Sequence, residues 1–331
     1  MNKEQNKILM LGNEWHGNFS LSLYWNLQKM GIDCGHIKMN HEWKPNRFLN
    51  KIEKILFVKK LNKLLIDEIN KNDTSLILVI SGYNILPKTY ELIKSKQIPM
   101  IAWIGDDPFK KTDIFNNLHY FSKVFLVDQE WVNLTKYLYP KAEFLPHAAD
   151  PEVFYPINPR RKYENDIVFV GSSYHSSPDG LLRAEILKTL FENGFDIKLY
   201  GDNGWKKLFS KYPFLEKIFM NKMVGPQELN TIYNSTKIVL NIQHSELKSG
   251  TNQRTFEIAS AGAFQLVDYQ RPIGELFNGN IITFNSSSDL VEKAKHYLTH
   301  EEERDKLAEK AREIVINNHT YKIRIEKLLY G

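Results

Sequence analysis

The sequence has a single cysteine, Cys34, among 331 residues. It therefore cannot form an internal disulfide, and a zinc site built from cysteines is excluded. No apolar run approaches the roughly 20 residues that a membrane-spanning helix needs. Residues 1–7 are polar and lead directly into a short apolar run, without the pattern of a secretory signal peptide. These absences are typical of a cytoplasmic protein, and we expect that location.

The sequence also lacks an excess of charge of one sign. Its net charge is +5, and the basic residues are interspersed with acidic ones, which argues against a nucleic-acid-binding stripe. Weak attraction to an anionic membrane surface or to a phosphorylated ligand is compatible with this charge. The composition, 42% hydrophobic and 25% charged, is that of a globular protein. The length is sufficient for two domains of ordinary size.

Short apolar runs alternate with helical patterns through the first half of the chain. Buried strands that alternate with helices predict a parallel sheet with both faces covered. Glycine, serine or aspartate directly follows each run. The runs are residues 8–11, 76–80, 100–104 and 124–127, and the separating helices are expected at about 47–70, 87–96 and 130–138.

A proline-rich segment interrupts the alternation, with prolines at 146, 151, 156 and 159. Because proline is excluded from the interior of regular elements, we interpret this segment as a domain junction. The alternation then restarts, with strands expected at 167–170, 197–200, 238–242, 264–267 and 281–284. Two amphipathic helices are expected between 301 and 329, with a break near 317–320.

Three segments resemble the group 1 glycosyltransferases of the GT-B fold, and most closely their CgeB-like branch. The junction Leu-Pro-His-Ala-Ala-Asp-Pro-Glu-Val-Phe-Tyr-Pro (145–156) is similar to the interdomain signature of that family. The block from Gly250 to Asp268 is similar to its donor-site block, and the tail from Tyr297 to Tyr321 to its C-terminal helices. The first half matches only loosely, mainly at Trp-Ile-Gly-Asp-Asp-Pro (103–108).

This resemblance implies an α/β protein with two Rossmann-like parallel-sheet domains that face each other across a cleft. We expect an acceptor-side domain at 1–156, a nucleotide-sugar-binding domain at 157–313, and a C-terminal helix at 314–331 that packs back on the first domain. The implied activity is transfer of a sugar from a nucleotide diphosphate sugar, with a UDP-sugar as the preferred expectation. The reaction would retain the anomeric configuration and need neither metal nor cofactor. The acceptor is a hydroxyl of a protein, a glycan or a lipid-linked compound.

Arg254 and Glu257 lie one helical turn apart in the donor-like block. The resemblance implies that Glu257 contacts the donor ribose, whereas an acidic residue in a first turn can also simply stabilise the helix dipole. Arg254 can bind a diphosphate and stabilise the charge of the leaving group, or it can form an exposed intrahelical ion pair. Many relatives carry a first glutamate where this sequence has Ser249. Lys248 is a second candidate cation.

Further donor contacts are expected where strands of the second domain end. Gly171, Ser172 and Ser173 follow the first of these strands, and their backbone and hydroxyl groups can donate to a phosphate. The alternative is an ordinary turn with serine caps, since the sequence has no G-x-G-x-x-G motif. The N–H groups after Gly250, those of Thr251 and Asn252, are candidates for the same role.

The first domain offers candidates for handling the acceptor. Glu14 or His16 can orient a hydroxyl, or their loop is purely structural. Asp106 and Asp107 can supply a general base, although Asp107 can equally be a cap. Adjacent acidic residues point to opposite sides of an extended chain, so a shared metal is not expected. His147 in the junction is a candidate cleft residue or a structural hinge histidine.

Two other functions fit the same pattern. A nucleotide-sugar epimerase can use this fold and would turn over the donor without an acceptor. A catalytically degenerate binding subunit would retain the donor site alone, and the serine at 249 keeps this alternative open. Donor hydrolysis discriminates the alternatives, because a binding subunit releases no nucleotide diphosphate. The sequence does not indicate an oligomeric state.

Overall fold

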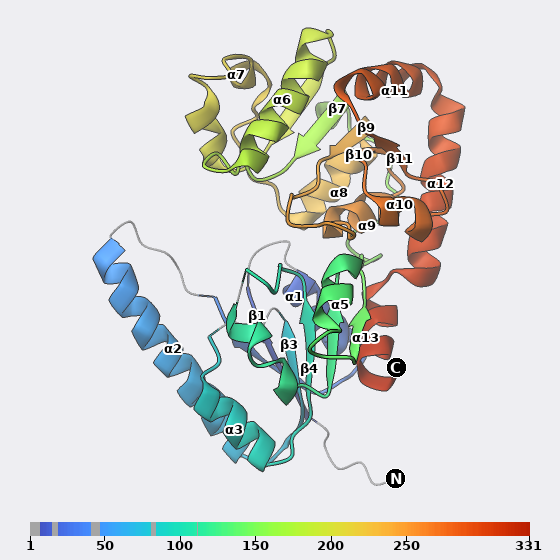
Figure 1. Cartoon of the computed structure of the whole chain (residues 1–331). Helices are drawn as coiled ribbons and strands as arrows, with labels where there is room; N and C mark the ends of the chain where they lie inside the picture. The colour runs from blue at the N-terminus through green and yellow to red at the C-terminus, as the bar shows by residue number, and fades with distance from the viewer. Residues whose placement is uncertain (1–6, 15–18, 41–46, 81–83, 111) are drawn as a thin grey trace. The chain divides into compact units, whose positions relative to one another are not determined.

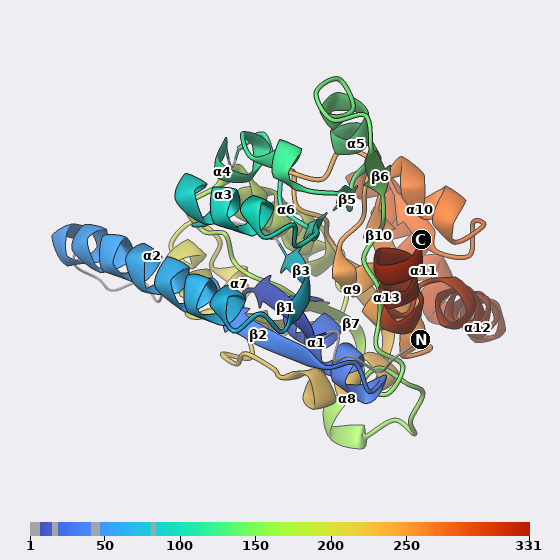
Figure 2. The same ribbon diagram turned by 90° about the horizontal axis from the view of Figure 1, so that it is seen from below.

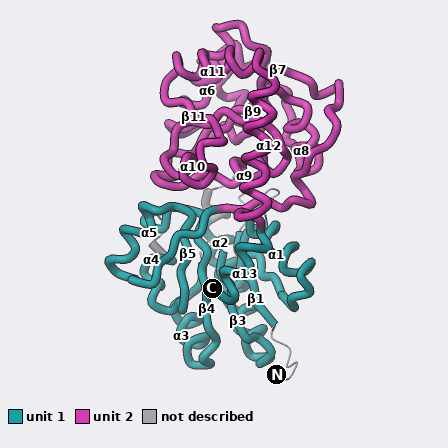
Figure 3. Tube along the Cα trace, turned by 90° about the vertical axis from the view of Figure 1, so that its right-hand side faces the viewer, with its two compact units in different colours: residues 1–146, 321–331 teal, residues 147–320 magenta. Residues whose placement is uncertain are grey.

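The protein is described by a computed structural model that covers residues 7–14, 19–40, 47–80, 84–110 and 112–331 (Figure 1). The chain divides into two compact units, coloured separately in Figure 3. Unit 1 contains residues 1–146 and 321–331, and unit 2 contains residues 147–320. The prediction had placed these boundaries at 156/157 and 313/314.

Unit 1 is built on a six-stranded parallel sheet with the strand order β2-β1-β3-β4-β5-β6. The central strands are almost wholly buried apolar runs, as expected for a sheet covered by helices on both faces. The strands are β1 (Lys7–Gly12), β2 (Cys34–Lys38), β3 (Thr74–Ile80), β4 (Met100–Ile104), β5 (Lys123–Leu126) and β6 (Ala142–Phe144). The helices are α1 (Phe19–Lys29), α2 (Arg47–Asn70), α3 (Pro87–Ser95), α4 (Thr112–Phe115), α5 (Gln129–Thr135) and α13 (Tyr321–Tyr330).

Unit 2 contains a five-stranded parallel sheet with the order β11-β10-β9-β7-β8. The strands are β7 (Asn165–Val170), β8 (Ile197–Tyr200), β9 (Thr236–Asn241), β10 (Gln265–Asp268) and β11 (Ile282–Phe284). The helices are α6 (Pro178–Glu192), α7 (Phe214–Ile218), α8 (Pro226–Asn234), α9 (Gln253–Ser260), α10 (Arg271–Leu276), α11 (Ser287–Thr299) and α12 (Glu301–Asn318). Both sheets confirm the predicted α/β class.

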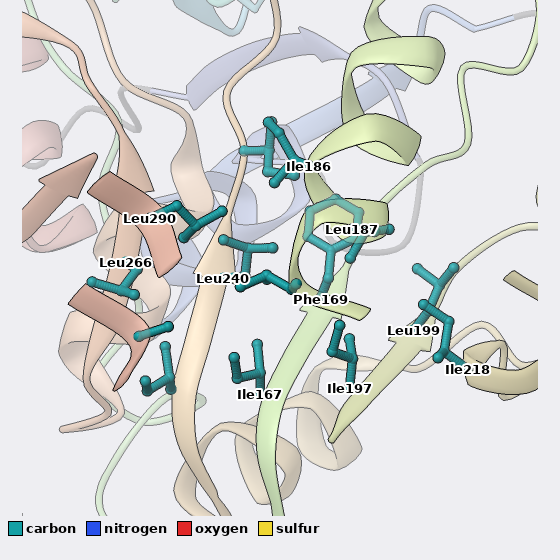
Figure 4. Close-up of a cluster of buried hydrophobic side chains, with 14 of the residues drawn as sticks. Ile167, Phe169, Ile186, Leu187, Ile197, Leu199, Ile218, Leu240, Leu266 and Leu290 are labelled. Atoms are coloured by element: carbon teal, nitrogen blue, oxygen red, sulfur yellow. The ribbon is translucent and has the colours of Figure 1, made fainter. Parts of the chain in front are cut away.

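Alternating residues of the unit 2 strands form its main core. Phe169 of β7, Leu240 of β9 and Leu266 of β10 point to the same side and pack against Leu187 of α6 and Leu290 of α11 (Figure 4). All five side chains are at most 2% exposed. This core fixes the sheet, so the loops that follow its strands have a rigid base.

The last helix, α13, belongs to unit 1, although unit 2 separates it from the rest of that unit in sequence. Arg324 Nε donates to the carbonyl oxygen of Pro146 at 2.7 Å, and Tyr321 packs edge-on against Trp103. The predicted return of the C-terminal region to the first domain is therefore confirmed. Helix α12 stays with unit 2, where it contacts α9. Figure 2 shows the same elements from below.

Candidate functional site

Polar side chains gather at the edge of the unit 2 sheet where β7, β8, β9 and β10 end. Each strand has a buried apolar segment and is followed by a polar loop. In parallel α/β sheets, ligands bind at this carboxyl edge, so these loops form the candidate site.

The loop after β7 is held by an aspartate that the sequence analysis missed. Asp202, which follows β8, accepts hydrogen bonds from the backbone N–H of Ser173 at 2.7 Å and from its hydroxyl at 2.8 Å. Its carboxylate also accepts from the N–H of Gly204 at 2.7 Å. Burial would raise the pKa of Asp202, but these hydrogen bonds outweigh it and lower the pKa. The donors of Ser173 are thus used within the protein, against the expectation that they face a phosphate.

Helix α6 begins against this loop. A Cβ on Gly180 would lie 2.3 Å from the carbonyl oxygen of Tyr174 and 2.4 Å from that of Ser173. Only glycine allows such a close approach of the helix to the backbone. Ser172 is exposed at the tip of the same loop, and Gly171 donates its N–H to Tyr200 within the sheet.

Arg183 of α6 is buried, although arginine is mostly found at protein surfaces. It is 5% exposed and donates to the carbonyl oxygens of Ser172 at 2.7 Å and Ile242 at 3.2 Å. Its guanidinium also lies over the ring of Tyr174, 4.7 Å from the centroid. Arg183 thereby joins the loops after β7 and β9. Burial, with the nearby positive charge of Arg254, lowers its pKa.

A second buried carboxylate fixes the loop after β9. Asp179 accepts from the N–H of Ser245 at 2.7 Å and from its hydroxyl at 3.1 Å. His244 Nε2 lies 3.5 Å from the same carboxylate, and its Nδ1 accepts from the N–H of Glu246 at 3.2 Å. Burial opposes ionisation of Asp179, but the contacts with Ser245 and His244 outweigh it and lower its pKa. This carboxylate is therefore charged at neutral pH.

A buried polar network positions the start of α9. Asn252 caps the helix by accepting from the N–H of Thr255 at 3.0 Å, while its own N–H donates to Gln243 Oε1 at 2.7 Å. Asn241 donates to Thr255 Oγ1 at 3.0 Å, and Thr251 shares a 2.6 Å hydrogen bond with the same hydroxyl. The Asn252 N–H and the Thr251 hydroxyl are accordingly engaged inside the protein.

The network extends to the end of β10. Asp268 Oδ1 accepts from the N–H of Gln243 at 2.7 Å. Burial raises the pKa of Asp268 to about 6, against the opposing effects of this hydrogen bond and of Arg183. Asp268 is therefore protonated more readily than an ordinary aspartate.

The two residues of the donor-like block lie on α9 as predicted, but they are not ion-paired with each other. Arg254 Nε donates to the phenolic oxygen of Tyr233 on α8 at 3.2 Å. Glu257 is 6% exposed and accepts from Gln253 Nε2 at 2.6 Å. Burial raises the pKa of Glu257 to about 7, although Arg254 and Gln253 act in the opposite direction. For Arg254, burial favours loss of the charge, but Tyr233 and Glu257 outweigh it and the pKa is raised.

Two further candidates belong to unit 2. Lys248 is exposed in the loop between β9 and α9, and the neighbouring Ser249 is half-buried. His147 is 7% exposed at the first position of unit 2.

The candidates of unit 1 fall on two loops. Glu14 is exposed, and its carboxylate lies 3.3 Å from His36 Nδ1 and 3.9 Å from Lys38 Nζ. Asp107 accepts from the N–H of Phe109 at 2.9 Å, which is a capping contact of the turn after β4. Asp106 precedes it and is half-buried. His16 lies outside the described residues.

Among the described residues, no three histidine, cysteine, aspartate or glutamate side chains are arranged to hold a metal ion. Within the same part of the chain, no helix combines the length and apolar character required to cross a bilayer.

Two Rossmann-like parallel-sheet units, with the last helix returned to the first, define a protein of the GT-B glycosyltransferase fold. Residues 183–330 match the family described as "Glycosyl transferase-like". The spore protein CgeB of Bacillus subtilis (strain 168) is 26% identical over 231 residues, which are 65% of this chain and 69% of CgeB. The resemblance inferred from the sequence is thereby confirmed as a distant one.

Solved structures share the fold at low sequence identity. Sucrose-phosphate synthase from Thermosynechococcus elongatus has a TM-score of 0.72 at 10% identity, with 97% of both chains covered. HepE from Anabaena, in complex with UDP, has a TM-score of 0.61 at 13% identity, covering 97% of this chain and 98% of HepE. An E. coli trehalose-6-phosphate structure bound with UDP-2-fluoro glucose has a TM-score of 0.66 at 11% identity, covering 98% and 99%.

Proposed function

We propose that this protein transfers a sugar from a nucleotide diphosphate sugar, with a UDP-sugar as the favoured donor, to an acceptor hydroxyl. The proposal assigns donor binding to the carboxyl edge of the unit 2 sheet. It assigns acceptor binding to unit 1, with Glu14, His16, Asp106 and Asp107 as the candidates. The reaction is proposed to retain the anomeric configuration and to need no metal.

The observation that carries this proposal is that two arginines of unit 2 have no carboxylate partner among the described residues. Arg183 and Arg254 are close enough to affect each other's charge, and within the described residues neither lies within 4.0 Å of a carboxylate. Arg183 is 5% exposed and Arg254 is half-buried, and a guanidinium partly or wholly withdrawn from water without a carboxylate partner is stabilised when an anion binds beside it. A diphosphate supplies that anion and matches the bidentate geometry of a guanidinium.

Glu257 supports a nucleotide rather than a simple phosphate as the ligand. It lies one turn after Arg254 on α9, so one helix carries both a cation and a carboxylate. A carboxylate can accept hydrogen bonds from both ribose hydroxyls, as acidic residues do in other nucleotide-binding folds. The first turn of α9 adds backbone N–H groups that favour negative charge.

In the proposed reaction, the bond between the anomeric carbon and the diphosphate oxygen breaks, and its electron pair stays with the nucleotide diphosphate. The acceptor oxygen forms the new bond on the same face, and its proton passes to the departing phosphate oxygen. The anomeric carbon has oxocarbenium character in the transition state. Arg254 stabilises the charge that develops on the leaving group, and the nearby Arg183 adds positive charge.

A thermal-shift screen of the intact protein against UDP, GDP, TDP and CDP, and their sugar conjugates, tests donor binding. A ligand at 100 times its Kd stabilises the folded state by about 2.7 kcal/mol. Arg254→Ala combined with Glu257→Ala should abolish the shift. Arg271→Ala with Glu275→Ala is the matched control, because these exposed residues form an ordinary pair on α10. A panel without any shift contradicts the proposal.

Incubation with the identified donor separates transfer from the alternatives. A transferase releases some nucleotide diphosphate by slow hydrolysis and releases more when the correct acceptor is added. An epimerase instead converts the donor sugar without an acceptor. A binding subunit shows the thermal shift and releases nothing.

A further inference from the structure

Helix α2 presents large apolar side chains to solvent. Ile52 is 44% exposed, Ile55 51%, Leu56 59% and Leu64 46%. The first turns of α2 extend beyond the strands of the unit 1 sheet, as Figures 1 and 2 both show. We call these four side chains, with Lys59, Lys60 and Lys63 on the same side of the helix, the α2 face.

The α2 face is not the side of the helix that holds the fold together. Leu61, Leu65 and Ile69 are at most 3% exposed and form the side that packs on unit 1. On this side Asn62 also accepts from the N–H of Leu86 at 2.9 Å and from the Thr89 hydroxyl at 2.7 Å. The helix therefore carries apolar residues on two sides, and the core accounts for only one of them.

Basic residues surround the exposed apolar ones. Lys51, Lys54, Lys59, Lys60 and Lys63 are all exposed, and none forms an ion pair with a described residue. Glu53 is the one acidic residue between 51 and 64, so this segment has a net charge of +4, close to the +5 of the whole chain. Most of the net positive charge of the chain is therefore concentrated in residues 51–64, whereas basic and acidic residues nearly balance in the rest of the sequence.

A hollow adjoins the α2 face. It has a volume of about 920 Å³ and lies between α2 and the edge strand β2. Leu56, Phe57 and Leu64 line one side, and residues 35–38 line the other. Charged side chains complete the lining, namely those of Lys7, Glu53, Lys60, Glu68 and Lys71. A volume of this size can accept an apolar group as large as a typical small ligand.

We propose that the α2 face docks unit 1 on an anionic phospholipid membrane. Apolar side chains flanked by lysines on one helix face are the pattern of helices that lie in the membrane interface. Each lysine near an anionic surface adds attraction, while Ile52, Ile55 and Leu56 enter the boundary of the acyl region. The adjoining hollow gives an acyl chain a place to lie. This proposal does not depend on the proposed transfer reaction.

The charge argues against the other occupants. A second copy of the chain would bring the same lysines opposite one another, and like charges in an interface are repulsive. A nucleic acid would match the charge but would leave the isoleucine and leucine side chains in water. An anionic bilayer satisfies both the charged and the apolar residues.

Co-sedimentation with lipid vesicles tests the proposal with the full chain. We expect binding to phosphatidylcholine vesicles that contain phosphatidylglycerol, and no binding to phosphatidylcholine alone. Lys59→Glu, Lys60→Glu and Lys63→Glu together should weaken binding by at least about a hundredfold, since loss of each lysine removes a factor of about five and the new glutamates are repelled by the anionic surface. Ile55→Ser with Leu56→Ser should weaken binding at least roughly tenfold.

Two matched variants control for general effects. Lys295→Glu, Lys306→Glu and Lys310→Glu make the same charge change at exposed positions of unit 2, and Leu134→Ser with Leu138→Ser removes exposed apolar groups elsewhere in unit 1. Both should bind vesicles like the unchanged protein. Absence of binding to anionic vesicles, or equal loss in the controls, overturns the proposal. So does light scattering that shows a dimer dissociated by Ile55→Ser with Leu56→Ser.

Discussion

Arg254 Nε donates to the phenolic oxygen of Tyr233 at 3.2 Å, and this hydrogen bond joins the start of α9 to α8. Tyr233 is completely buried, and its pKa is raised because burial opposes its ionisation. The hydroxyl therefore stays neutral and orients the guanidinium without cancelling its charge. An arginine held in this way keeps its positive charge, which is what the proposed contact with a diphosphate requires.

Tyr233→Phe should weaken nucleotide diphosphate binding by about tenfold, because a hydrogen bond to a charged group is worth about 1.5–3 kcal/mol. Isothermal titration calorimetry with the nucleotide found in the screen measures the change. Tyr297→Phe removes a hydroxyl from another buried tyrosine of unit 2 and should leave the affinity unchanged. Equal affinity in both variants would mean that Tyr233 does not orient Arg254 for the ligand.

Arg183→Lys should lower the melting temperature of the protein by about 5 °C. The shorter ammonium cannot reach both the Ser172 and Ile242 carbonyl oxygens, and an unsatisfied buried acceptor costs about 1–3 kcal/mol. Differential scanning calorimetry provides the measurement. Arg271→Lys, on an exposed side chain, is the control. A melting temperature within a degree of the control contradicts the joining role of Arg183.

The free energy of unfolding of the Glu257→Gln variant, relative to that of the unchanged protein, should increase as the pH rises. The pKa of Glu257 is about 7 in the folded protein and near 4.5 when unfolded, so only the folded state keeps the proton between these values. The free energy of unfolding then falls as the pH rises from 4.5 to 7. Glutamine removes this dependence. Urea denaturation of both proteins at pH 5 and pH 8 measures the effect. The free energy of unfolding of the glutamine variant, relative to that of the unchanged protein, should be higher at pH 8 than at pH 5. Glu275→Gln is the control and should show no such change.

Asp202→Asn should destabilise the protein at neutral pH and matter less in acid. The folded pKa of Asp202 lies below its ordinary value of 3.8, so the ionised carboxylate stabilises the fold above that value. This contribution is lost as the pH falls through the folded pKa. Melting temperatures measured from pH 7 down to pH 3 should therefore converge for the two proteins. A gap that stays constant would show that the effect is not due to the charge.

Apolar runs bounded by glycine or proline were sufficient to predict the central elements. Met100–Ile104 and Ile197–Tyr200 match β4 and β8, and the helix expected at 87–96 matches α3 to within one residue. Strand β2 was missed because Cys-Gly-His-Ile-Lys has no apolar run and its side chains are half-exposed at the sheet edge. Helix α10 was missed because Arg-Pro-Ile-Gly contains residues that normally end helices.

The placement of Arg254 and Glu257 on one helix was predictable from the sequence, but their contacts were not. Both residues were proposed through the family block, whereas Asp179 and Asp202 act through loops distant in sequence. Arg183 could have been recognised, because it falls on the buried stripe of α6 with Gly180 and Leu187. A charged residue at such a position needs buried partners, and only the tertiary structure supplies them.

The return of α13 to unit 1 has a consequence for synthesis on the ribosome. Residues 147–320 form a continuous unit, so they can fold as soon as they emerge. Residues 1–146 are made first, but two of their contacts form only after α13 has been synthesised. These are the packing of Trp103 against Tyr321 and the hydrogen bond from Arg324 to the Pro146 carbonyl oxygen. The half of the protein that is translated earlier is thus the half that is finished later, and until then its nascent chain exposes the surface on which α13 will pack.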